Sequence, residues 1–135
     1  MQELEKLLIR IKEGDCAPDY FDLLCDVVFA FWEKKKKNIF NVIKDITIRN
    51  LKWLKEETKK RYQKLYTDPK MREFLKIFSI LNIRSNFDQM IKVAEKTNEL
   101  ESLCAIIVES GLYAEEKFRN ELYQELLKVL QGESK

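Results

Sequence analysis

The chain has 135 residues, 45% of them hydrophobic and 36% charged, with only three glycines and two prolines. This is close to the commonest size of a single domain, and the composition is too hydrophobic for a disordered segment, so we predict one folded domain over residues 1–135. The chain contains no histidine, which excludes Ser-His-Asp and Cys-His catalysis, HExxH zinc sites and acid–base catalysis by histidine.

Apolar residues recur at three- and four-residue steps along most of the chain, and no run alternates strictly, which predicts an all-α fold. The first helix is expected over residues 2–13. The second begins at Pro18, a favoured first-turn residue, and is apolar around most of its girth from 20 to 32, so we expect a central helix with neighbours on several sides. Its apolar stripe is formed by Phe21, Leu24, Cys25, Val28, Phe31 and Trp32.

The third helix is expected over residues 39–66, which contain no glycine or proline. Its apolar seam follows an eleven-residue repeat, which keeps a seam aligned along a nearly straight helix of about 40 Å. The seam consists of Phe40, Ile43, Thr47, Leu51, Leu54, Thr58, Tyr62 and Leu65. Further apolar residues lie off the seam, and we expect burial within the domain, with docking to a second copy or another subunit as the alternative. These residues are Ile39, Ile46, Ile48 and Trp53.

Four shorter helices complete a predicted irregular bundle of about seven helices. Three of them follow residues suited to helix capping, and the last carries apolar residues from Phe118 to Leu130. The capping residues are Asp68 (followed by Pro69), Ser85 (with Asp88) and Asn98 (with Glu101). A glycine follows the first, sixth and seventh of the predicted helices, where a left-handed cap is common. These glycines are Gly14, Gly111 and Gly132.

Charge is distributed unevenly along the chain. Residues 34–72 hold 14 Lys and Arg against 4 Asp and Glu, whereas residues 1–33 hold 3 against 8 and residues 73–135 hold 8 against 11. On the long helix the basic residues fall on two strips, and two tyrosines lie at the edge of and within the first strip. The first strip is Lys44, Lys52, Lys55 and Lys59, the second is Arg49, Lys60 and Lys64, and the tyrosines are Tyr62 and Tyr66. Such a surface attracts phosphates, and tyrosines stack on unpaired bases. The candidate nucleic-acid-binding residues are Lys34, Lys35, Lys36, Lys37, Lys44, Arg49, Lys52, Lys55, Lys59, Lys60, Arg61, Tyr62, Lys64 and Tyr66.

Two other interpretations of this basic segment stay open. Lysine-rich helix faces keep proteins soluble, and the acidic flanking segments can pack over the basic helix as internal ion pairs. Few Arg, Asn or Gln stand at regular positions for reading base edges, so any contact with DNA or RNA is expected to be mainly to phosphates and of low sequence specificity.

Carboxylates offer the remaining route to catalysis, through a hard metal such as Mg²⁺. Asp19, Asp22 and Asp26 lie near one face of the second helix, and the second cluster such a site needs has two candidates: Glu95 with Glu99, and Glu121 with Glu125. Carboxylates at these spacings are common on solvated helix surfaces. The three cysteines are scattered and cannot make a Cys₄ zinc site. We therefore predict no metal site, no cofactor and no enzymatic activity.

The sequence as a whole predicts a non-enzymatic accessory protein. Its basic helix is expected to contact a nucleic-acid backbone, and by analogy of build it would be a small subunit of a larger nucleoprotein or defence complex. The alternatives are a helical adaptor or inhibitor of a protein target, including a second copy of the chain, and, third, an all-α phosphohydrolase.

We expect a cytoplasmic protein without a membrane partner. The first helix lacks the apolar segment of a signal peptide, and the apolar run from 20 to 32 is too short to span a membrane. The unpaired cysteines suit a reducing compartment.

Overall fold

The computed structural model describes residues 2–14, 17–34, 39–65 and 80–132. Within these ranges the chain forms six α-helices and one 3-10 turn and no strand, which confirms the all-α fold. The helices are α1 (Gln2–Glu13), α2 (Ala17–Glu33), α3 (Ile39–Leu65), α5 (Ile80–Lys96), α6 (Leu100–Glu109) and α7 (Glu116–Leu130), with η1 (Leu112–Ala114) before α7. Seven helices were expected, and most of the fourth falls on residues 66–79, outside the described ranges.

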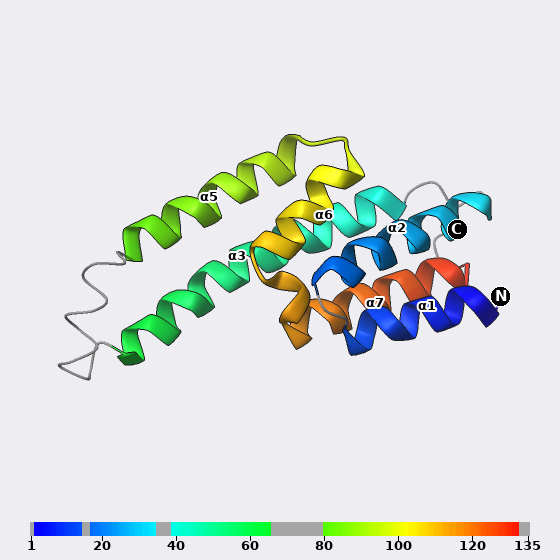
Figure 1. The fold of residues 1–135 in the computed structure, drawn as a ribbon, viewed down its shortest axis with the longest axis horizontal. Helices are drawn as coiled ribbons and strands as arrows, with labels where there is room; N and C mark the ends of the chain where they lie inside the picture. The colour runs from blue at the N-terminus through cyan, green and yellow to red at the C-terminus, as the bar shows by residue number, and fades with distance from the viewer. Residues whose placement is uncertain (1, 15–16, 35–38, 66–79, 133–135) are drawn as a thin grey trace.

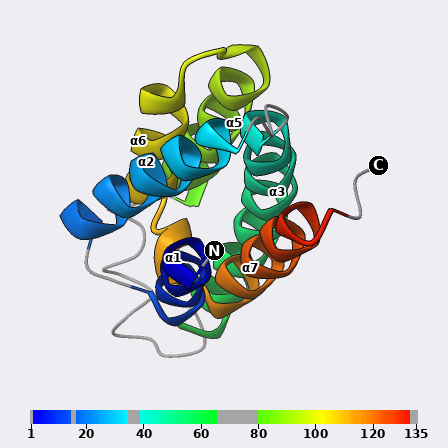
Figure 2. The ribbon, with the colours of Figure 1, turned by 90° about the vertical axis from the view of Figure 1, so that its right-hand side faces the viewer.

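Helix α3 is the longest element and has a neighbour along each flank (Figure 1). Helix α5 runs antiparallel to it on one side, and α7 runs antiparallel to it on the other. Helix α1 packs antiparallel against α7, and α2 packs against α1 and α6, as the view along the long axis shows (Figure 2). The expected central position of α2 is therefore met in part, because it contacts α1, α3 and α6 and leaves another face to solvent.

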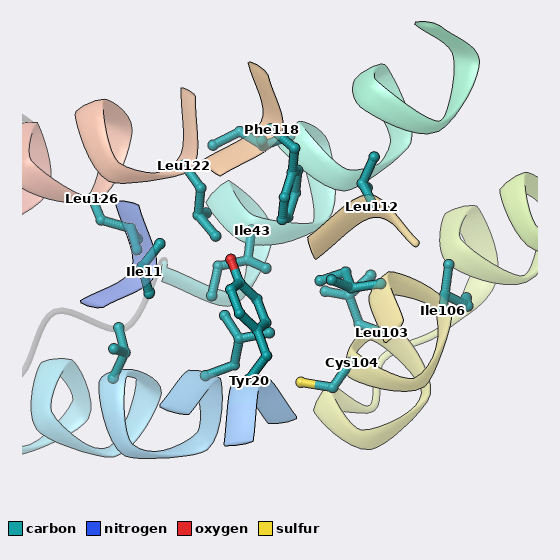
Figure 3. Close-up of a cluster of buried hydrophobic side chains, with 14 of the residues drawn as sticks. Ile11, Tyr20, Ile43, Leu103, Cys104, Ile106, Leu112, Phe118, Leu122 and Leu126 are labelled. Carbon is teal, nitrogen blue, oxygen red and sulfur yellow. The ribbon is translucent and has the colours of Figure 1, made fainter. Parts of the chain in front are cut away.

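The core collects side chains from all six helices. Figure 3 shows Tyr20 of α2 among Ile11 of α1, Ile43 of α3 and Leu122 of α7. The predicted seam of α3 is buried from Ile43 through Leu54, and the off-seam Ile39 and Ile46 are buried beside it. This confirms that the apolar excess of the first half of α3 is used largely inside the domain.

Two polar side chains of α3 are fully buried beside this seam. The hydroxyl of Thr47 donates a hydrogen bond of 2.7 Å to the carbonyl oxygen of Ile43, and the amide nitrogen of Asn50 donates one of 2.9 Å to the carbonyl oxygen of Ile46. These bonds offset the cost of removing the two polar groups from water.

Two predicted helix starts differ from the structure. Helix α5 begins at Ile80, so Ser85 lies inside the helix and does not cap it. Helix α6 begins after Glu99, not Asn98, and Glu99 makes no side-chain cap. The backbone N–H of Glu99 donates instead to the hydroxyl of Thr97 at 3.1 Å. A cap contributes only about 1 kcal/mol, so a capping residue by itself does not fix where a helix begins.

The junction between α1 and α7 is closed by Arg119. Its Nη1 donates a hydrogen bond of 3.1 Å to the carbonyl oxygen of Glu13, one of the carbonyls that the end of α1 leaves without a helical partner. Gly14 follows with a φ of 85°, in the left-handed region that glycine adopts without strain. A Cβ at this position would lie 2.2 Å from Arg119 Nη1, so any other residue would force the Arg119 side chain to move.

We expect Gly14→Ala to destabilise the protein more than Gly111→Ala. Both glycines have positive φ, and a non-glycine residue there costs about 1–2 kcal/mol. Nothing lies within 4 Å of a Cβ at Gly111, whereas at Gly14 it displaces Arg119 from the end of α1. Urea unfolding of the two variants measures the difference. Equal losses of stability would show that Arg119 contributes nothing at this junction.

Candidate functional site

One predicted basic strip of α3 lies along its boundary with α5. Lys44 Nζ donates a hydrogen bond of 3.0 Å to the carbonyl oxygen of Thr97, and Lys55 Nζ forms an ion pair with Asp88. Both ammonium groups are therefore held by the chain that follows α3. This is the internal pairing that the sequence left open as an alternative.

Two candidate arginines of α3 lie beside α7 and the residue before it. Arg49 forms an ion pair with Glu121 at 3.3 Å. Arg61 makes two parallel hydrogen bonds to Glu115, with Nη1 at 3.3 Å from one carboxylate oxygen and Nη2 at 3.1 Å from the other. The guanidinium group suits such two-point contacts with a carboxylate. Four of the described candidate residues are thus bonded within the chain.

The outward face of α3 carries charges of both signs. Lys52 and Lys60 are exposed and Lys59 is half-buried, and none of the three forms an ion pair with another described residue. Asp45 and Glu56 stand on the same exposed face. Among the described candidate side chains of α3, the structure therefore leaves a smaller free positive surface than the sequence suggests.

The structure describes few of the remaining candidate side chains. Lys34 is exposed at the end of α2. Tyr62 and Lys64 are in α3, but their side chains are outside the described part. Also outside the described residues are Lys35, Lys36, Lys37 and Tyr66.

Helix α2 exposes two large aromatic side chains that the sequence placed in an apolar, central helix. Phe29 is 63% exposed and Trp32 is 60% exposed, although Trp32 was predicted on the buried stripe. The two rings meet edge to face, with centroids 6.3 Å apart and planes at 86°. The buried face of α2 is formed instead by Tyr20, Leu23, Leu24, Val27 and Phe31.

These aromatic rings form one wall of an open groove of about 720 Å³ between α2 and the start of α6. The wall from Cys25 to Trp32 spans two helical turns, about 11 Å. Leu100 contributes an apolar surface from α6. The groove is lined by Cys25, Val28, Phe29, Trp32, Glu99, Leu100 and Glu101.

Carboxylates border both sides of this groove. On α2, residues advance by about 100° each, which places Asp22, Asp26 and Glu33 in a stripe next to Phe29. At the start of α6, Glu99 just before the helix and Glu101 within it line the opposite side. All five are exposed, and none forms an ion pair with another described residue. The site therefore combines an apolar floor with an acidic border, and we name it the α2–α6 groove.

The chain matches no known family model, no curated protein and no solved structure. Inference about function therefore starts from the residues of this chain alone.

Cys25, which lines the groove, and the buried Cys104 beside it are poorly suited to nucleophilic chemistry. Burial, with the negative charges of Asp22, Asp26 and Glu101, raises the pKa of Cys25 above its usual value, against a hydrogen bond from Cys104 that lowers it. Burial, with the charge and hydrogen bond of Cys25 and the charge of Glu101, raises the pKa of Cys104 to about 12. Thiolates, the reactive form, are scarce at neutral pH under these conditions.

The carboxylates considered for a metal site are not assembled into one among the described residues. No group of three or more metal-ligating side chains occurs in this part of the chain. Glu121 is bonded to Lys117 and Arg49, and Glu125 is paired with Lys128. The side chain of Asp19 lies outside the described part.

None of the described helices is both long and apolar enough to cross a bilayer.

A polar cluster joins α3 to α7 on the face away from the α2–α6 groove. Lys117 Nζ donates to the buried amide oxygen of Asn50 at 3.1 Å, bonds the Glu121 carboxylate and lies 5.1 Å from the centre of the Trp53 ring. Burial by itself would raise the pKa of Glu121, but the hydrogen bond and charge of Lys117, with Arg49 and Asn50, outweigh it and hold that pKa below its usual value. The cluster is therefore a structural link that depends on an ionised carboxylate.

We expect the stability conferred by Glu121 to be lost at acidic pH. Because its pKa is lower in the folded protein than in the unfolded chain, this contribution is complete above the usual value of 4.5 and disappears as the pH falls through the lowered value. The melting temperature of the wild type should therefore fall more steeply below pH 4.5 than that of Glu121→Gln. Glu56→Gln, which removes an exposed carboxylate without a described ion-pair partner, is the control and should leave the steep dependence in place. Equal slopes for wild type and Glu121→Gln would contradict the assignment.

Proposed function

We propose that this protein is a non-enzymatic interaction module that binds a helix of another protein in the α2–α6 groove. The observation that carries the proposal is the exposure of Phe29 and Trp32, more than half of each side chain, on the wall of an apolar groove. Large adjacent apolar side chains on a surface mark interaction sites, and tryptophan is enriched among the residues that dominate binding energy.

The size of the groove favours a helix as the bound element. A wall two turns long accommodates the two or three apolar side chains that an amphipathic helix presents at steps of three and four residues. Burying an aromatic side chain removes about 150–250 Å² from water, so Phe29 and Trp32 can supply much of the apolar contact of a modest interface. This function is the adaptor that the sequence ranks second.

The chemistry of the groove also supports binding over catalysis. Its thiols have raised pKa values, and its carboxylates stand on opposite edges of an open, apolar floor. The chain contains no histidine to act as a general base near neutral pH. These features suit contact with a partner that is held by apolar side chains.

A nucleic-acid backbone is a second candidate partner, supported by Lys52, Lys59 and Lys60. These three side chains have no carboxylate partner among the described residues, and they lie on one stretch of α3. We rank this candidate second because Lys44, Arg49, Lys55 and Arg61 are bonded within the protein and Asp45 and Glu56 share the exposed face.

We expect Phe29→Ala to weaken the binding of an amphipathic helical peptide without lowering stability. The peptide carries leucines at steps of three and four residues, and a scrambled peptide of the same composition is its control. Trp53→Phe leaves Trp32 as the single tryptophan, so a blue shift of its emission reports binding in the groove. Loss of a central aromatic contact should lower affinity about 30-fold, since such residues contribute about 2 kcal/mol or more.

Ile9→Ala removes another exposed apolar side chain, on α1, and should leave the affinity unchanged. Equal shifts with the scrambled peptide, or equal losses for Phe29→Ala and Ile9→Ala, would show nonspecific adhesion and would sink the proposal.

The nucleic-acid candidate predicts weak binding of mixed-sequence DNA or RNA that declines steeply with salt, because each phosphate contact releases counterions. Replacing Lys52, Lys59 and Lys60 together by glutamate should abolish this binding in a fluorescence-anisotropy titration at two salt concentrations. Lys55 is left intact, since its replacement would break the ion pair with Asp88. Unchanged affinity of the triple variant would exclude the outward face of α3 as the binding surface.

A further inference from the structure

We infer that the helix bound in the α2–α6 groove is basic, with lysine or arginine side chains on both sides of its apolar stripe. This inference rests on the function proposed above and specifies the partner for the same groove. It is carried by the way in which the protein distributes its carboxylates between internal ion pairs and this groove.

Three carboxylates on α5 and at or near α7 form ion pairs within the molecule. Asp88 pairs with Lys55, Glu115 pairs with Arg61, and Glu121 pairs with Arg49 and Lys117. These acids thus neutralise the two basic flanks of α3. They have no free charge to offer to a partner.

The carboxylates that border the α2–α6 groove form no such pairs, although Asp26 also lines a smaller pocket with Lys6 and Arg10 of α1. Asp22, Asp26 and Glu33 on α2 and Glu99 and Glu101 on α6 are exposed and form no ion pair with another described residue. No described basic side chain lines the groove. Five like charges beside one apolar surface repel one another, and a partner that brings positive charge relieves this repulsion.

The apolar surface of the α2–α6 groove determines which kind of cationic partner it can bind. A metal ion or a small polyamine would leave Phe29, Trp32 and Leu100 in water, whereas a basic amphipathic helix covers these side chains with its apolar stripe. Lysine and arginine side chains at the margins of that stripe extend along the apolar surface and reach the carboxylates with their charged ends. A helix bordered by glutamate or aspartate would meet like charges on both sides and bind less tightly.

The test compares three peptides that share the same leucine stripe and differ in their polar positions, which are lysine, glutamine or glutamate. Binding is followed through Trp32 in the Trp53→Phe protein. We expect the lysine peptide to bind at least about tenfold more tightly than the glutamine peptide, the glutamate peptide to bind weakest, and the difference to shrink at high salt.

A second experiment replaces three of the groove carboxylates by neutral amides in the full chain. Asp22→Asn, Asp26→Asn and Glu101→Gln together should lower the affinity for the lysine peptide about tenfold, because exposed ion pairs contribute modestly and add up. They should leave the affinity for the glutamine peptide unchanged. Glu56→Gln on the outward face of α3 is the matched control and should affect neither peptide.

The outcomes separate this inference from the proposed function. Equal affinities for the three peptides, or an unchanged affinity of the triple variant for the lysine peptide, would overturn the basic partner and leave a helix-binding groove. Failure of all three peptides to shift the emission of Trp32 would remove the proposed function itself. Sedimentation of the chain alone is expected to show a monomer, and a dimer that Trp32→Asp dissociates would make a second copy the occupant and overturn the inference.

Discussion

The basic flanks of α3 can pack beside α5 and α7 only because these helices bring carboxylates and a carbonyl oxygen to them. Unpaired ammonium and guanidinium groups at a helix boundary lose hydration on packing, and the loss must be met by a partner. Asp88 and the carbonyl oxygen of Thr97 compensate for the lost hydration on the α5 side, and Glu115 and Glu121 compensate for it on the α7 side.

This arrangement determines where free charge is left on the molecule. Asp88, Glu115 and Glu121 are used along α3, and the outward face of that helix keeps a mixture of Lys52, Lys60, Asp45 and Glu56. The acids of α2 and of the start of α6 have no such use and border the exposed aromatic side chains. The surface most suited to a partner therefore lies on α2 and α6, although the sequence drew attention to α3.

Much of the fold follows from local sequence. Periodicity places α1, α2, α3 and α7 within a residue or two of their ends, and the positive φ of Gly14, Gly111 and Gly132 agrees with their predicted places at helix ends. The errors fall where local signals are weak, as at Ser85, which becomes an interior residue of α5. Asn50 was also missed as a buried residue, because its burial depends on Lys117 reaching it from a helix 67 residues away.

The candidate site could not be deduced in the same way. Phe29 and Trp32 look like core residues in sequence, since a helix that is apolar on several sides is usually covered on several sides. The available signal was that Asp22, Asp26 and Glu33 form a polar stripe beside Phe29, which leaves that edge of α2 without an apolar neighbour.

The sequence alone determined the helices and their apolar faces, because both depend on residues three and four positions apart. Tertiary structure alone decided which charges are neutralised and which apolar face stays open, because these depend on pairs such as Arg49 with Glu121 and on where α6 begins beside α2. Such pairings join residues far apart in the chain, and no local pattern encodes them.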